Sequence, residues 1–247
     1  MVSVPYLFKL NPLCFLMNPA DVELPEKLKE VFSKEGILQF RPAQEKAIQA
    51  GLLEGKNLLI CTPTASGKTL IAELASGKTI LEQHKKAVYI VPLIALANDK
   101  HKDFTRKYQH TFRVTQSSGD LDTSDKYLAD YDLIICTAEK LDSLTRHHAS
   151  WLTQIGCVIL DEIHLLNDTE RGPTLEILIT LLRQITPHAQ IIGLSATIGN
   201  PQELAAWLEA TLVQDTWRPV PLHKGVYCNG IIQFELENSN APEQTKP

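Results

Sequence analysis

The feature that most constrains this sequence is an apolar run that leads directly into a glycine-lysine-threonine loop. Residues 57–61, NLLIC, are typical of a strand buried on both faces. Residues 62–69, TPTASGKT, follow without a break and match the phosphate-loop pattern, except that Thr62 replaces its first glycine. Such a loop needs a strand before it and a helix after it, so we expect an α/β domain.

The residue types of this loop suit a nucleoside triphosphate with magnesium. The ammonium group of Lys68 would neutralise the β- and γ-phosphates, and the Thr69 hydroxyl would be a ligand of Mg²⁺. We therefore predict an ATP site here. Backbone N–H groups at the start of the helix would cradle the phosphates, and we assign this role to Thr64, Ala65, Ser66 and Gly67.

A second copy of the loop's last four letters, SGKT, occupies residues 76–79. It follows a helical run, residues 70–74, and not a strand. Its amides should be committed to the helix, or should close that helix at Gly77. We predict that Lys78 does not contact phosphate.

Another apolar run, residues 157–160, ends in the acidic pair Asp161-Glu162 of the letters DEIH. A carboxylate at the end of a strand beside a phosphate loop is suited to hold the nucleotide's magnesium, and we assign Asp161 to it. Glu162 is then placed to orient and deprotonate the attacking water. His164 does not form an HExxH pattern, so we expect no zinc site.

Apolar runs and helical patterns alternate along the rest of the chain, which is typical of a parallel sheet with helices on both faces. Ligands of such sheets bind beyond the carboxyl ends of the strands, where each motif lies. The predicted strands are 57–61, 87–91, 133–136, 157–160 and 191–194. The predicted helices are 24–34, 43–53, 94–108, 139–147, 173–185 and 201–208.

The charge of the chain limits how it can contact nucleic acid. With 29 acidic and 24 basic residues, its formal charge is -5, which argues against coating by bulk positive charge. Any strand contact must be local. The basic and aromatic stretch 100–108 is one candidate, but it is equally typical of a solvated helix face.

The five cysteines are widely spaced and form no CxxC pair, so neither a zinc site nor a disulfide framework is expected. Cys61, Cys136 and Cys157 lie in apolar runs. We assign them structural roles as small buried side chains in a reducing cytosol.

These motifs, in this order, resemble those of superfamily 2 helicases. The resemblance implies a RecA-like P-loop lobe with motif I at TPTASGKT, motif II at DEIH and motif III at residues 195–197, SAT. Ser195 and Thr197 would then couple hydrolysis to the nucleic-acid strand, although either hydroxyl alone could be a helix cap. Residues 40–44, FRPAQ, look like the adenine-reading Q motif, in which Gln44 would bind the base; the alternative is an exposed helix residue.

Two further stretches are similar to the strand-gripping motifs Ia and Ib. The first is residues 91–97, VPLIALA, and the second is residues 137–140, TAEK, where Ala138 replaces the usual proline. Helix N-termini and hydroxyls suit phosphate contacts that do not depend on base sequence. The resemblance assigns these contacts to Pro92, Leu96, Thr137 and Lys140, with loop and cap roles as the alternative.

The letters DEIHLLNDTERGPTLEILI and RPVPLHKGVY narrow the resemblance to the Ski-two-like group, especially archaeal fork-remodelling DNA helicases and the helicase lobe of polymerase theta. It implies a single-stranded or forked DNA substrate, 3′ to 5′ movement, and a second RecA-like lobe with an arginine finger. Without that finger we expect slow hydrolysis. An RNA helicase of the same group, or a nucleotide-binding module without motor activity, remain alternatives.

The predicted boundaries are residues 1–23 for an N-terminal extension, 24–217 for the RecA-like domain and 218–247 for a linker toward the second lobe. Lys9, Asn11 and two prolines interrupt the apolar opening, so we do not expect a secretory leader. No apolar stretch reaches the roughly 18 residues that span a bilayer. We expect a cytoplasmic or nucleoid-associated protein without membrane contact.

Overall fold

The computed structural model describes residues 17–117, 126–220, 222, 225–228 and 231–234. The predicted N-terminal extension therefore lies mostly outside the described residues, as do residues 235–247 of the predicted linker. The chain divides into two compact units, Met1–Trp217 and Arg218–Pro247, and each is described by itself. No helix among the described residues is long and apolar enough to cross a membrane.

The first unit is built around a seven-stranded sheet in which every neighbouring pair is parallel. The strand order is β3-β4-β2-β5-β6-β1-β7. The strands are β1 Leu58–Cys61, β2 Lys86–Val91, β3 Val114–Ser117, β4 Leu133–Thr137, β5 Ile155–Leu160, β6 Gln190–Ser195 and β7 Thr211–Gln214.

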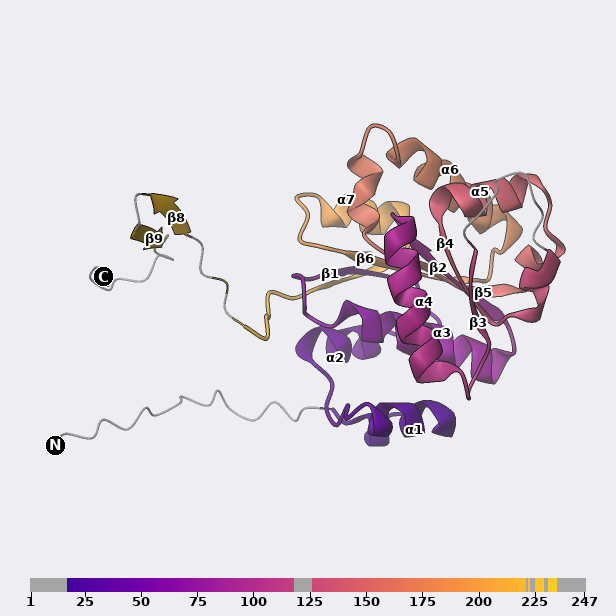
Figure 1. Ribbon diagram of the computed structural model, residues 1–247, viewed down its shortest axis with the longest axis horizontal. Helices are drawn as coiled ribbons and strands as arrows, with labels where there is room; N and C mark the ends of the chain where they lie inside the picture. The colour runs from indigo at the N-terminus through magenta and orange to yellow at the C-terminus, as the bar shows by residue number, and fades with distance from the viewer. Residues whose placement is uncertain (1–16, 118–125, 221, 223–224, 229–230, 235–247) are drawn as a thin grey trace. The chain divides into compact units, whose positions relative to one another are not determined.

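In the described part of this unit, α-helices lie on both faces of the sheet (Figure 1). Leu58 and Ile60 of β1 pack in a core with the first four helices, whereas Leu59 and Cys61 pack with the last three, because successive strand residues face opposite sides. This confirms the predicted α/β class. The helices are α1 Glu26–Lys34, α2 Pro42–Gln49, α3 Lys68–Gln83, α4 Ile94–Tyr108, α5 Ala138–Arg146, α6 Gly172–Ile185 and α7 Pro201–Trp207.

The strand order brings the three main motifs to one edge of the sheet. Strand β1, which precedes the phosphate loop, pairs with β6, and β6 pairs with β5, which precedes the acidic pair. Cys61 is in register with Ser195, and Asp161 N donates to the Ile90 carbonyl at the end of β2. Residues about 100 positions apart thus meet at the carboxyl ends of neighbouring strands, as the parallel arrangement requires.

Two strands of this sheet were not predicted, β3 and β7. Each lies at an edge of the sheet, and each is only four residues long and only partly buried, so neither has the continuous apolar run of the central strands. Helix α2 ends at Gln49 and not at residue 53, and Gly51 follows with a φ of 102°, which only glycine adopts readily.

The second SGKT lies inside α3, as predicted from its context. Ser76 is fully buried and its hydroxyl donates to the Ala72 carbonyl within the same helix. A Cβ atom on Gly77 would meet the Leu28 side chain at 2.7 Å, so this glycine permits close packing of α1 on α3. Lys78 forms an ion pair with Glu82 at 2.7 Å.

The second unit contains an antiparallel pair of strands, β8 Gly225–Cys228 and β9 Ile231–Phe234. This segment was predicted as an extended linker, so the hairpin was missed. The sequence did carry a signal for it, because Asn229-Gly230 between two runs of β-branched and aromatic residues is typical of a hairpin.

The three cysteines of the sheet should be unreactive in the folded chain. Burial raises the pKa of the Cys61 thiol to about 11 and those of Cys136 and Cys157 to about 12, so the nucleophilic thiolate is scarce at neutral pH. We expect iodoacetamide at about pH 8 to modify all three only after denaturation. Peptide mass analysis checks this; equal labelling of Cys61 with and without denaturant would contradict the burial.

Candidate active site

The phosphate loop between β1 and α3 has the backbone shape of an anion cradle. Ala65 and Gly67 both have positive φ values, 67° and 93°, which turn their N–H groups into a common concavity. A Cβ atom on Gly67 would lie 2.4 Å from the Gln44 side-chain nitrogen, so only glycine fits here. Thr64 and Ala65 are exposed, whereas Ser66 is buried. This geometry fits a nucleotide's phosphates.

Hydrogen bonds within the loop hold its two sides together. Lys68 Nζ donates to the carbonyls of Thr62 and Pro63 over 2.8 and 3.2 Å, and the hydroxyls of Thr62 and Ser66 are 2.7 Å apart. Thr62, which replaces the first glycine of the pattern, is therefore a structural part of the loop. The ammonium group of Lys68 is held against the loop and is partly exposed, so a bound phosphate could accept a hydrogen bond from it.

The acidic pair follows β5 in a constrained turn. Asp161 Oδ2 accepts from the Tyr89 hydroxyl over 2.9 Å, and Oδ1 accepts from the backbone N–H of Glu162 over 3.1 Å. Burial and the negative charge of Asp161 raise the pKa of Tyr89 well above its usual value, so this hydroxyl stays a donor. Glu162 has a φ of 52°, an uncommon conformation for a residue with a Cβ atom, and such strain is frequent at functional sites.

The two residues predicted to bind magnesium turn toward one cation. Lys100 Nζ donates to Thr69 Oγ1 over 2.9 Å and lies 3.7 Å from Asp161 Oδ2. A hydroxyl and a carboxylate are the oxygen ligands that Mg²⁺ takes beside nucleotide phosphates, usually with several waters. Thr69 and Asp161 therefore fit a magnesium ion held together with a nucleotide.

Gln44 links the Q-motif stretch to the phosphate loop. Only 3% of it is exposed, which excludes the alternative of an exposed helix residue. Its side-chain oxygen accepts from Arg41 N over 2.8 Å, and its nitrogen donates to the Gly67 carbonyl over 3.0 Å. Gln44 also lines a cavity of about 680 Å³ with Gly67 and Thr69, a size suited to a nucleotide's base and sugar. Its contact with adenine stays a prediction.

Ser195 and Thr197 occupy different environments. Ser195 is fully buried beside Cys61, and among the described residues its hydroxyl has no hydrogen-bond partner. Its carbonyl accepts from the backbone N–H of Thr62 over 3.3 Å, which ties motif III to the phosphate loop. Thr197 is exposed. The coupling of hydrolysis to the nucleic-acid strand through these residues stays a prediction. A buried hydroxyl without a partner is uncommon in proteins, which singles out Ser195 as a candidate functional residue.

A second cavity, of about 620 Å³, lies where the two strand-gripping stretches meet. Pro92, Thr137 and Lys140 line it, whereas Leu96 is exposed outside the lining residues. Thr137 also caps α5, since its hydroxyl accepts from Lys140 N over 3.4 Å, so the alternative cap role is present in the structure. The cavity brings together two stretches more than 40 residues apart, as a strand site would require.

Two basic residues line this cavity, and only one of them, Lys140, was predicted. Lys140 is only 3% exposed and is engaged with other groups of the protein, and its contact with a nucleic-acid strand stays a prediction. Arg171, at the start of α6, is exposed and lines the same cavity. Its sequence position did not reveal it, because it lies over 30 residues beyond motif Ib and reaches the cavity only through the packing of α6 beside α5.

The parallel sheet, the loop after β1 and the acidic turn after β5 together define a P-loop domain of the RecA-like kind. The model of the DEAD/DEAH box helicase family matches residues 41–204, and the chain belongs to that family. The match includes all of the phosphate loop, the acidic pair and the SAT stretch.

Comparisons with known proteins show which helicases this chain is similar to. The ATP-dependent DNA helicase Hel308 of Pyrococcus abyssi is 49% identical over 219 residues, which cover 89% of this chain and 30% of that protein. Hel308 of Methanocaldococcus jannaschii is 51% identical over 216 residues, covering 85% of this chain and 18% of that protein. A crystal structure of the DUF1998 helicase MrfA bound to DNA superposes with a TM-score of 0.68 and 26% identity, over 78% of this chain and 30% of that one.

These matches confirm the similarity to superfamily 2 helicases of the Ski-two-like group and the RecA-like fold. The chain spans 30% or less of the length of the relatives named above. What those longer proteins do as a whole does not transfer directly to this chain.

Proposed function

We propose that this chain is the first ATP-binding lobe of a motor that moves 3′ to 5′ along DNA and unwinds or remodels forks when joined to a second RecA-like lobe. Relatives that share about half of the residues are named as ATP-dependent DNA helicases, which supports DNA as the substrate. We place this activity in the cytoplasm or at the nucleoid.

The observation that carries the proposal is the convergence of Thr69 and Asp161 on one cation, beside the phosphate cradle. These residues come from α3 and from the end of β5, so their meeting is a property of the tertiary structure. A hydroxyl and a carboxylate at that point are the oxygen ligands that a magnesium–nucleotide complex takes.

Each residue has a defined task in hydrolysis. Lys68 and the loop N–H groups bind the phosphates, and Thr69 and Asp161 hold the metal. A bound magnesium ion would neutralise charge on the phosphates and fix their position. Glu162, whose backbone is held by Asp161, orients a water and accepts its proton.

Movement requires that the strand site respond to the nucleotide. Pro92 and Thr137 lie in the lining of the second cavity, and backbone N–H groups at the starts of α4 and α5 can contact phosphodiester groups without reading bases. Closing of two lobes around ATP and reopening after hydrolysis would alternate the grip on the strand.

Magnesium-dependent ATP hydrolysis tests this function. The rate is measured for the chain alone and mixed with the second RecA-like lobe of a Hel308 relative, each with and without single-stranded DNA. Stimulation by DNA only in the mixture is the expected result. Stronger stimulation by RNA would favour an RNA helicase, and Lys68-dependent ATP binding without hydrolysis in either sample would favour a nucleotide-binding module.

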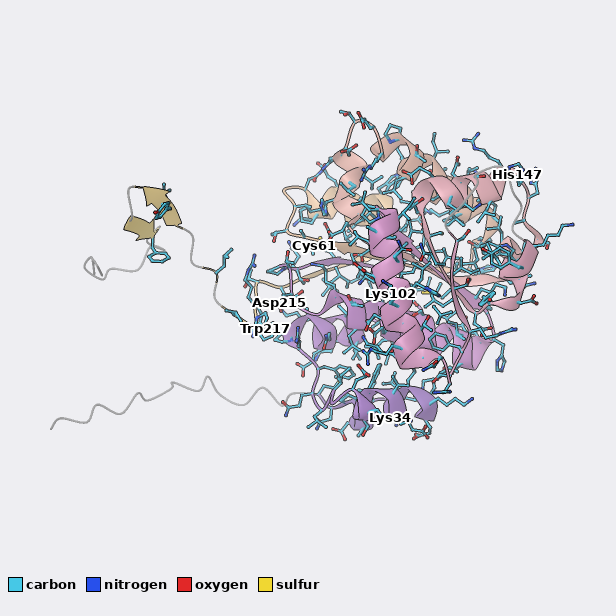
Figure 2. All side chains as sticks on the ribbon, in the orientation of Figure 1. Lys34, Cys61, Lys102, His147, Asp215 and Trp217 are labelled. Carbon is cyan, nitrogen blue, oxygen red and sulfur yellow. The ribbon has the colours of Figure 1, made fainter. Side chains whose placement is uncertain are left out.

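Replacing Arg171 with glutamine should weaken binding of single-stranded DNA several-fold. Arg171 would neutralise one phosphate, so the slope of log K against log salt should fall by about 0.7. Fluorescence anisotropy across a salt series measures both quantities. Lys34→Gln, an exposed lysine on α1 (Figure 2), removes the same charge and should change neither; an equal effect of both variants would mean that only net charge matters.

A further inference from the structure

Lys100, on α4, contacts both of the residues assigned to magnesium. Its ammonium nitrogen is 2.9 Å from Thr69 Oγ1 and 3.7 Å from Asp161 Oδ2. One cation on a third element therefore joins α3 to the end of β5. The side chains of Lys100 and Asp161 are 21% and 15% exposed, so solvent screens their attraction only in part.

The surroundings of this ammonium group favour a positive charge at the same point. Lys100 Nζ lies 5.2 Å from the centroid of the Tyr89 ring, a distance at which a cation is attracted to an aromatic face. The Tyr89 hydroxyl donates to Asp161 Oδ2, which fixes that carboxylate in its orientation toward Lys100. The site is thus arranged for a cation held by oxygens.

Helix α4 connects the ammonium group of Lys100 to the cavity that is predicted to bind a nucleic-acid strand. The helix begins at Ile94, which lines the cavity, and Lys100 lies about 1.7 turns further along. Near the other end, Lys107 Nζ and the Tyr108 hydroxyl both bind the buried Glu73 of α3, over 2.9 and 2.7 Å. Helix α4 therefore makes polar contacts with α3 at two points along its length. The Lys100–Thr69 contact is the one nearer to the cavity that is predicted to bind a nucleic-acid strand.

We propose that the ammonium group of Lys100 occupies the metal site when magnesium is absent and leaves Thr69 and Asp161 when magnesium binds. Magnesium binding is thereby linked to the end of α4 that is predicted to contact the nucleic-acid strand. This inference rests on the proposed function, in which ATP and magnesium bind at the loop. Two cations repel strongly at such short distances in a partly buried site. An ammonium group cannot keep these contacts beside a divalent ion, so Lys100 has to move. The contact of α4 with Thr69 of α3 is then broken.

A magnesium titration tests the proposal. The chain is saturated with a fluorescent, non-hydrolysable ATP analogue, and the midpoint for magnesium is compared among variants. Lys100→Met removes the charge at similar volume, and we expect its midpoint to fall about tenfold because the competing cation is gone. Lys100→Arg keeps the charge and should titrate close to wild type. Lys102→Met removes the same charge from an exposed position on α4 (Figure 2) and should change nothing.

Amide hydrogen exchange of residues 97–100 of α4, whose N–H groups donate to carbonyls one turn earlier, is the second readout, because a lysine with only a packing role would not connect this turn to the metal. In wild type, magnesium added to the analogue-bound chain should alter exchange there. In Lys100→Met, exchange should be the same with and without magnesium.

Several outcomes would overturn the inference. One is a magnesium midpoint of Lys100→Met that is unchanged or higher. Another is a response of the amides of residues 97–100 to magnesium in that variant that equals the wild-type response. Loss of analogue binding by Lys100→Met in EDTA would also overturn it, since Lys100 would then be a phosphate ligand. Failure of the wild-type chain to bind the analogue under any condition counts against the proposed function itself, and is seen before any variant is compared.

Discussion

Replacing Lys68 with alanine is expected to abolish ATP binding, with an affinity loss of about 10²- to 10⁴-fold. A hydrogen bond to a charged group contributes about 1.5–3 kcal/mol, and the ammonium group of Lys68 would make such bonds to two phosphates. The nitrogen already lies within the loop, 2.8 Å from the Thr62 carbonyl. Equilibrium binding of a fluorescent ATP analogue measures the loss.

The sequence supplies its own control in the second SGKT. Lys78→Ala removes the same side chain from the same four-letter context, but it lies within α3 and pairs with Glu82. Loss of that pair should cost about 0.3–0.5 kcal/mol of folding stability and leave ATP binding intact. Lys68→Ala also removes hydrogen bonds within the loop, so thermal unfolding of both variants must show that they are folded. Loss of binding in Lys78→Ala with normal binding in Lys68→Ala would reverse both assignments.

Replacing Glu162 with glutamine is expected to reduce ATP hydrolysis by about 10²- to 10⁴-fold while nucleotide affinity stays near wild type. A positioned general base contributes a factor of this size, and glutamine keeps the shape of the side chain but cannot accept the proton of the attacking water. The metal and phosphate contacts belong to other residues, Asp161 and Lys68, so binding should survive. Single-turnover hydrolysis, followed for the chain with its second lobe and DNA, separates chemistry from binding.

Glu170→Gln is the matched control, because Glu170 is an exposed carboxylate in the loop that follows the acidic pair. It makes the same change of charge and should leave the rate unchanged. If Glu162→Gln hydrolyses ATP as fast as this control does, the base is another group and the role of the acidic pair is limited to the metal. If Glu162→Gln loses nucleotide affinity instead of rate, Glu162 supports the binding site and not the chemistry.

Much of the fold could be predicted from local patterns. Helix α4 was predicted at residues 94–108 and is observed at Ile94–Tyr108, because its apolar residues recur at helical spacing and Phe104 and Tyr108 are fully buried. The five central strands were recognised because strands covered on both faces are continuously apolar. The edge strands β3 and β7 were missed because half-exposed strands of four residues have no such signal.

The order of the motifs also determined the nucleotide site in outline. A phosphate loop after one strand and an acidic pair after another must meet at the carboxyl edge of a parallel sheet, so Lys68, Thr69 and Asp161 could be placed together from sequence. The two copies of SGKT could be told apart because only one of them follows a strand. The family comparison agrees with this assignment of the fold and class.

Only the tertiary structure decided which side chains contact one another across the site. Lys100 could be read equally as a solvated helix residue or as a strand contact, yet it lies against Thr69 and Asp161, 31 and 61 positions away. Lys140, which was assigned to the strand by resemblance, is buried, and Arg171, which was not predicted, is exposed and lines the same cavity. The physical reason is that hydrophobic periodicity determines which face of a helix is buried, whereas a polar contact depends on the rotation and position of that helix against its neighbours, which the packing of the whole core determines.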